Sequence, residues 1–144
     1  MSRRPSALSS CQIQPPETHR KAVIEASSIS TGQREISRGT VALYKEYVGR
    51  GPTGARTYIA DDMVVVILSE SLLPAERRLV EQGNHGTVRQ IRRDFQMAMR
   101  EPMKALVEEA LGRKVLCLLS DHSPDPDFAS EVFVLEPETP EQRP

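Results

Sequence analysis

Tryptophan is absent from the chain, and aromatic residues make up only 4% of its 144 positions. Proteins that bind single-stranded nucleic acid stack bases on aromatic side chains, so this composition disfavours that class of function. The formal net charge is −1 at pH 7, which provides no overall attraction to nucleic acid or to an anionic membrane. We therefore do not expect nucleic acid to be the partner.

Long hydrophobic runs and paired cysteines are also missing. No apolar run approaches the roughly 20 residues that a transmembrane helix needs, and the N-terminus lacks the apolar segment of a signal peptide. The two cysteines, Cys11 and Cys117, do not form a Cys-x-x-Cys motif. Cys117 lies in the apolar run Val115–Leu119, where we expect a small buried hydrophobe. These features predict a cytoplasmic protein without disulfides or direct membrane insertion.

The stretch Gly49–Glu70 contains the most hydrophobic segment of the chain. An alternating run, Ala55–Ile59, is followed by a turn at two aspartates and then by Met63–Leu68, which is rich in β-branched residues. Such residues favour strands. The pattern predicts a hairpin whose second strand is buried on both faces.

Helical periodicity predicts three helices. A first helix is expected over 31–48, with Ile36, Thr40, Leu43 and Tyr47 on its buried face. A short helix should begin at Pro74. A long helix is expected over 87–111, where Pro102 predicts a kink or a break into two helices.

The C-terminal part predicts a second hairpin. Strands are expected over 114–119 and from residue 128 to 135, with Glu131 and Phe133 on the same face. Residues 120–127 contain two prolines and three aspartates, which indicates a loop. Residues 1–30 are rich in Ser, Pro and Gln and predict a disordered or loosely attached tail, and residues 138–144 predict a frayed end.

The element order α-β-β-α-α-β-β predicts one α+β domain over residues 31–137. We expect a two-layer sandwich with a four-stranded, mainly antiparallel sheet packed by helices. The Met63–Leu68 strand is too apolar for an uncovered second face. Either the first helix or the partner in a homodimer should cover it.

The glycine-rich phrase before the first strand has two interpretations. Backbone N–H groups near Arg50, Gly51, Gly54 and Arg56 could bind a small anion, with the Arg56 guanidinium suited to a bidentate carboxylate, bicarbonate or phosphate contact. Alternatively, the glycines only end a helix and form a turn. In that case Arg56 would pair with Glu70 or Asp62.

A basic face is expected on the long helix, formed by Arg89, Arg93 and Arg100 together with Gln96. It could contact an acidic protein surface or a phosphate backbone. The alternative is a solvated helix face with local ion pairs.

Acidic residues provide the remaining candidates for chemistry. Asp121, His122, Asp125 and Asp127 are weak candidates for a metal site, and turn formation explains the same residues. The lone His85 and the absence of a nucleophile motif give no support for catalysis. We expect neither an enzyme nor a bound cofactor.

Several sequence segments resemble those of one protein family in their residues and in their order along the chain. These are GRGPTGARTYIADDMVVVIL, LLPAERRLVEQG, VRQIRRDFQ, LGRKVLCLLSDHSPDPD and VFVLEP, and the match extends from about residue 34 to residue 137. They are similar to the MpsC family, named for a component of a Na+-translocating, membrane-potential-generating system. The resemblance implies a non-enzymatic accessory protein of a cation- or bicarbonate-transporting assembly, with a membrane transporter subunit as a partner. The alternative is a small-anion or nucleic-acid binding module.

Overall fold

The computed structural model describes the backbone of residues 17–143 and the side chains of residues 29–143. The described chain forms three helices and four strands in the expected order. These are α1 (Glu17–Val48), β1 (Gly54–Ala60), β2 (Met63–Ser69), α2 (Pro74–Glu81), α3 (His85–Leu111), β3 (Val115–Pro124) and β4 (Asp127–Leu135).

The strands form one antiparallel sheet in the order β1-β2-β4-β3. Each hairpin pairs locally, and the central contact between β2 and β4 joins the two hairpins. One row across the sheet runs from Tyr58 through Val65 and Val132 to Leu119. The predicted α+β fold with a four-stranded antiparallel sheet is confirmed.

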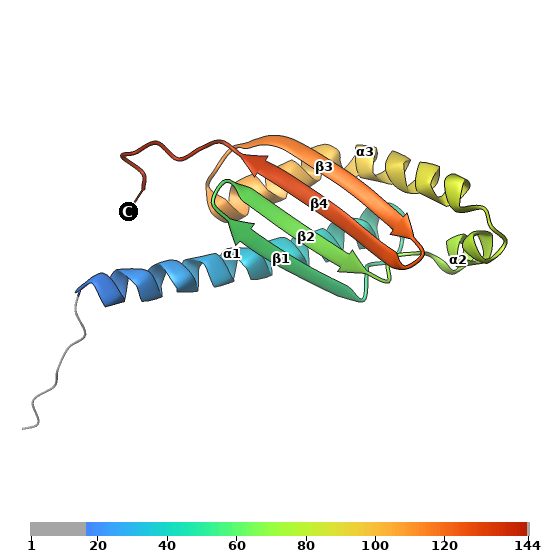
Figure 1. The fold of residues 1–144 in the computed structure, drawn as a ribbon, viewed down its shortest axis with the longest axis horizontal. Coiled ribbons are helices and arrows are strands. Elements are labelled where there is room, and N and C mark those ends of the chain that lie inside the picture. Colours follow the sequence, from blue (N-terminus) through green and yellow to red (C-terminus); the bar gives the residue numbers. More distant parts are fainter. Residues whose placement is uncertain (1–16, 144) are drawn as a thin grey trace, which may run out of the picture.

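Both long helices cover the same face of the sheet (Figure 1). α1 packs on β1, α3 packs on β3, and the two helices contact each other. Alternate strand residues such as Val64, Val66 and Phe133 point toward them and are fully buried. This alternation follows from the two-residue period of a strand, and it places the hydrophobic core in a single layer.

The first helix is longer than predicted. It begins at Glu17, so residues 17–30, which were expected in a tail, are helical; residues 1–16 lie outside the described part. Its buried stripe contains Ile36, Thr40, Tyr44 and Val48, whereas Tyr47 is 36% exposed. The four buried residues are spaced four apart and therefore lie on the side of the helix that faces the sheet. Tyr47 lies outside this spacing, so its predicted place on the buried face is wrong.

α3 continues through Pro102 as one helix, so the predicted break into two helices is wrong. Met99 and Met103 on either side of the proline are each 1% exposed. Packing of these side chains in the core favours a continuous helix despite the hydrogen bond that proline removes.

The predicted loop over residues 120–127 is also wrong. β3 continues to Pro124 and β4 begins at Asp127, so only Asp125 and Pro126 form the turn, and the peptide bond between them is cis. Asp121 pairs with Ser130, and His122 pairs with Ala129. Backbone pairing with β4 therefore overrides the turn preferences of the aspartates and prolines.

Gly39 lies at the crossing of α1 and α3 and gives a testable prediction. A Cβ atom there would be 2.3 Å from Leu106 Cδ1 and 3.1 Å from Leu106 Cγ. We expect Gly39→Ala to lower the free energy of unfolding by about 1–3 kcal/mol, because overpacking outweighs the gain in helix propensity. Urea denaturation would measure this change.

Gly86→Ala is the matched control, since no atom lies within 4 Å of the added Cβ. It should be neutral or stabilising by up to about 1 kcal/mol. If both variants gain stability, the two helices do not approach as closely in solution as the structure shows.

Candidate functional site

A buried ion pair between α2 and α3 organises one end of the domain. Arg92 Nη2 of α3 lies 2.5 Å from Glu76 Oε2 of α2 and donates a second hydrogen bond to the Ser71 carbonyl. The Arg92 and Glu76 side chains are only 2% and 5% exposed. Glu76 Oε2 also accepts a hydrogen bond from the Leu73 backbone N–H at 2.7 Å. One carboxylate thus closes the first turn of α2 and fixes α2 to α3.

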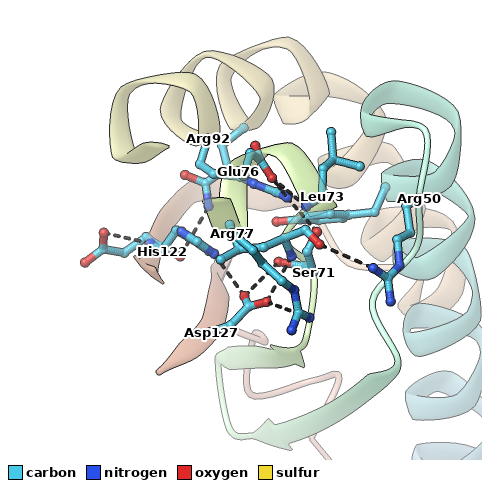
Figure 2. A network of polar contacts seen from close by, with 12 residues as sticks. Arg50, Ser71, Leu73, Glu76, Arg77, Arg92, His122 and Asp127 are labelled. Carbon is cyan, nitrogen blue, oxygen red and sulfur yellow. Dashed lines mark hydrogen bonds and ion pairs between the residues drawn. The ribbon is translucent and has the colours of Figure 1, made fainter. Parts of the chain in front are cut away.

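Asp127 connects the same region to the β3–β4 turn (Figure 2). Its carboxylate accepts a hydrogen bond from the Leu72 N–H at 3.0 Å, lies 3.3 Å from His122 Nε2 and 3.8 Å from Arg77 Nη2. Burial lowers the pKa of His122, and the hydrogen bond with Asp127 opposes this change. We call Ser71, Glu76, Arg92, His122 and Asp127 the Arg92 cluster.

Several polar atoms of this cluster have no hydrogen-bond partner among the described residues. They are Arg92 Nε and Nη1, Glu76 Oε1 and His122 Nδ1. A hollow of about 620 Å³ lies beside the cluster and is lined by Arg77, Asp127, Phe128 and acidic residues that include Glu81. The cluster binds the Ser71 carbonyl and the N–H groups of Leu72 and Leu73. These contacts fix the backbone that leads into α2.

The four metal candidates do not converge on one point. His122 and Asp127 are in contact, whereas Asp121 is the neighbour of His122 on a strand and points to the opposite face. Asp125 is exposed in the turn. Within the described residues, no group of three or more His, Cys, Asp or Glu side chains is arranged to hold a metal ion.

A second buried cluster lies between α1 and the sheet. Tyr44 Oη donates a hydrogen bond to Glu131 Oε1 at 2.8 Å, and the Ser120 hydroxyl donates to Glu131 Oε2. Glu131 is 1% exposed. Burial raises the pKa of Glu131 to about 7, against the opposing effect of its hydrogen bonds. Burial and the Glu131 carboxylate also raise the pKa of Tyr44.

The basic residues predicted to bind an anion or a partner lie in separate places. Arg56 is exposed on β1, at one edge of the sheet, whereas Arg89, Arg93 and Arg100 lie on α3, which packs against β3 at the other edge. Arg50 Nη1 is 3.5 Å from the Leu72 carbonyl. Binding of an anion by these residues stays a prediction, and the structure does not combine them in one pocket.

Some of these residues have structural contacts. Arg100 Nη2 donates to the Leu118 carbonyl at 2.6 Å and so covers part of the β3 edge. Gly51 and Gly54 lie where an added Cβ would be 3.0 Å from Val41 Cγ1 and 2.3 Å from Ser69 Oγ. Both glycines therefore permit close approach of the chain at this turn.

The alternative pairing of Arg56 is not formed. Asp62 instead lies 2.7 Å from Arg113 Nη2, and Glu70 accepts a hydrogen bond from Thr53 at 2.7 Å. The guanidinium of Arg56 has no ion-pair partner among residues 29–143.

The sheet face opposite the helices has no cover within the described part of the chain, and we call it the open face (Figure 1). Its exposed apolar side chains include Tyr58 (51%), Met63 (46%) and Leu119 (56%). β2 is thus buried on one face rather than on both, and α1 does not cover the other face. Cys117 is a half-buried free thiol on this face and not a core residue.

The sequence analysis missed the burial of Arg92, Glu76 and Glu131. Arg92 and Gln96 occupy the buried stripe of α3 with Val88 and Met99, although Gln96 was expected on the basic face of this helix. The spacing of four residues from Val88 was the available signal. For Glu131, the signal was its predicted position on the same strand face as Phe133.

Comparison with known proteins identifies one family. A family model described as "Na+-translocating membrane potential-generating system (MpsC)" matches residues 30–137. No curated protein and no solved structure matches the chain.

Proposed function

Because the chain belongs to the MpsC family, we propose that it is a non-enzymatic accessory protein of a Na+-translocating, membrane-potential-generating system. In this proposal it acts in the cytoplasm as a homodimer and binds a membrane subunit of a cation or bicarbonate transporter. Its contribution is to assemble or stabilise that system by protein–protein contact. The family match over residues 30–137 is the observation on which the proposal depends.

The distribution of polar groups supports a binding role. The strongly buried ionisable side chains, Arg92, Glu76 and Glu131, hold helices and strands together instead of facing a cavity. Exposed apolar residues such as Tyr58, Met63 and Leu119 gather on the open face, and Met97 of α3 is exposed on the helical side. Surfaces of this kind mark protein interaction sites.

Contact with the membrane would depend on the partner subunit. None of the helices in the described chain is long and apolar enough to cross a bilayer. A transporter subunit with cytoplasmic segments would provide the required attachment site.

Affinity purification from detergent-solubilised membranes of the native cell would test the proposal. The tagged chain should enrich an integral membrane subunit of a cation or bicarbonate transporter, identified by mass spectrometry, relative to an untagged strain. Deletion of the chain should also lower the sodium-dependent membrane potential measured with a voltage-sensitive dye. An unchanged potential in the deletion strain, together with no transporter subunit in the purified fraction, would contradict the accessory role.

A further inference from the structure

The open face is organised in four rows that cross all four strands, and three of these are a central row and the rows on either side of it. The central row contains Tyr58, Val65, Val132 and Leu119, and a neighbouring row contains Ala60, Met63, Val134 and Cys117. These two rows are almost entirely apolar. The row on the other side of the centre contains Arg56, Ile67, Ser130 and Asp121.

The third row has opposite charges at its two ends. Arg56 lies on the edge strand β1, and Asp121 lies on the edge strand β3. Both residues are exposed, and neither has an ion-pair partner within residues 29–143. The width of the sheet separates them, so they cannot pair within one chain.

A hollow of about 300 Å³ surrounds the Asp121 end of this row. It is lined by Ser123, Ser130, Ile67, Phe128 and Asp121 of the open face, and by the α3 residue Arg89 and the buried residues His122 and Ala129 of the helical side. Small side chains on β3 and β4 leave space there for a long side chain from a facing surface. The face thus has an unpaired cation at one edge and an unpaired carboxylate in a hollow at the other.

We propose that the open face binds a second copy of this chain about a two-fold axis that runs parallel to the strands, between β2 and β4. This inference rests on the homodimer of the proposed function and specifies its interface. This rotation places β1 of one copy opposite β3 of the partner, and β2 opposite the partner's β4. Each row keeps its position along the strand direction, so it faces the same row of the partner. Arg56 of each copy then lies opposite the partner's Asp121, and Val65 lies opposite the partner's Val132.

The size of the face fits such a dimer. Four strands about 4.8 Å apart and seven residues long, with a rise of about 3.4 Å per residue, give a footprint of roughly 450 Å² on each copy. That area is at the lower end of specific interfaces and predicts a dimer that dissociates at micromolar concentrations. Two aligned sheets pack at about −30° and interdigitate their side chains, which places Tyr58 against the partner's Leu119.

The charge arrangement favours a second copy over a different protein. A two-fold interface is self-complementary, so a cation on one edge must meet an anion on the other edge at the same level. Arg56 and Asp121 satisfy this requirement because they belong to one row.

Charge reversal tests the arrangement. Arg56→Asp and Asp121→Arg each create two like-charge contacts in the dimer, and each should weaken self-association by about tenfold or more in sedimentation equilibrium. The double variant should restore the wild-type value to within about threefold. Mixing the two single variants should produce a heterodimer, because each of the two contacts then joins opposite charges.

Arg38→Asp is the matched control, since Arg38 is an exposed residue of α1 on the helical side. It should leave self-association unchanged. If the wild type dimerises and the two reversals behave like this control, the interface lies elsewhere. That result would overturn the inference and leave the proposed accessory function intact.

Cross-linking gives an independent test that does not depend on charged variants. Ala60 and Cys117 end the same row, so Ala60→Cys in a Cys11→Ser background should lie near the partner's Cys117. A short bis-maleimide should give a covalent dimer with this variant, and it should not do so with Ala98→Cys on the exposed side of α3. Equal cross-linking of both variants would contradict the proposed orientation.

A wild-type protein that stays monomeric up to about 100 µM would overturn both the interface and the proposed homodimer. In that case residues 1–16 or a different protein would be the occupant of the open face. The transporter purification would still decide the accessory role separately.

Discussion

Glu76→Ala should lower the free energy of unfolding by about 3–5 kcal/mol, because it leaves the buried Arg92 guanidinium without its counter-charge. The Arg92 side chain is only 2% exposed, and Glu76 Oε2 is its sole acidic partner among the described residues. The same substitution removes the acceptor for the Leu73 N–H at the start of α2. A single domain has a total stability of about 5–15 kcal/mol, so the loss should be evident in urea denaturation.

Glu81→Ala on the exposed side of α2 is the matched control and should change stability by no more than about 0.5 kcal/mol. The double variant Glu76→Leu, Arg92→Met should recover most of the loss, since an apolar pair avoids the desolvation of both charges. A loss below about 1 kcal/mol for Glu76→Ala would mean that water reaches Arg92 in solution. It would contradict the buried position of the ion pair.

Glu131→Gln should remove a pH-dependent loss of stability that the wild type shows between about pH 4.5 and 7. Burial raises the pKa of Glu131 from 4.5 to about 7 in the folded chain. The folded state therefore binds the proton more tightly than the unfolded state does. The contribution of this group is fully present below pH 4.5 and is lost as the pH rises through 7.

The expected size follows from the shift in pKa. Ionisation of Glu131 should cost on the order of 3 kcal/mol by pH 8. Glutamine keeps an oxygen that can accept from Tyr44 and has no charge to bury. The variant should therefore be more stable than the wild type at pH 8 and similar to it near pH 4.5.

The informative measurement is the difference in free energy of unfolding between variant and wild type at each pH. The lowered pKa of His122 makes stability rise with pH, and this contribution cancels in the difference. Glu35→Gln, at an exposed site on α1, is the matched control and should show no such change. A difference that is constant from pH 4.5 to 8 would contradict a strongly raised pKa for Glu131.

Local patterns predicted the elements well because they depend on nearby residues. Alternation identified the strand Ala55–Ile59 and the shared face of Glu131 and Phe133, and both agree with the structure. The position of Pro74 identified the start of α2, and helical periodicity identified the end of α3 at Leu111. The extent of β3 was missed, since pairing with β4 and not local preference decides it.

The candidate site was less predictable than the fold. Arg92, with its neighbours on α3, has the composition of a solvated basic surface, and only its spacing of four residues from Val88 indicates that it is buried. Its partner Glu76 lies 16 residues away on another helix. Tyr44 and Glu131 are separated by 87 residues. Burial of a polar group is favourable only when a partner satisfies it, and such partners come from distant parts of the chain.

The sequence by itself determined the family, the order of helices and strands, and the apolar character of both faces of β2. The tertiary structure decided that α1 and α3 cover the same face and that the other face stays open. It also decided which charged residues are buried. Local spacing sets the period of each element, whereas the choice of covered face depends on contacts between elements far apart in the chain.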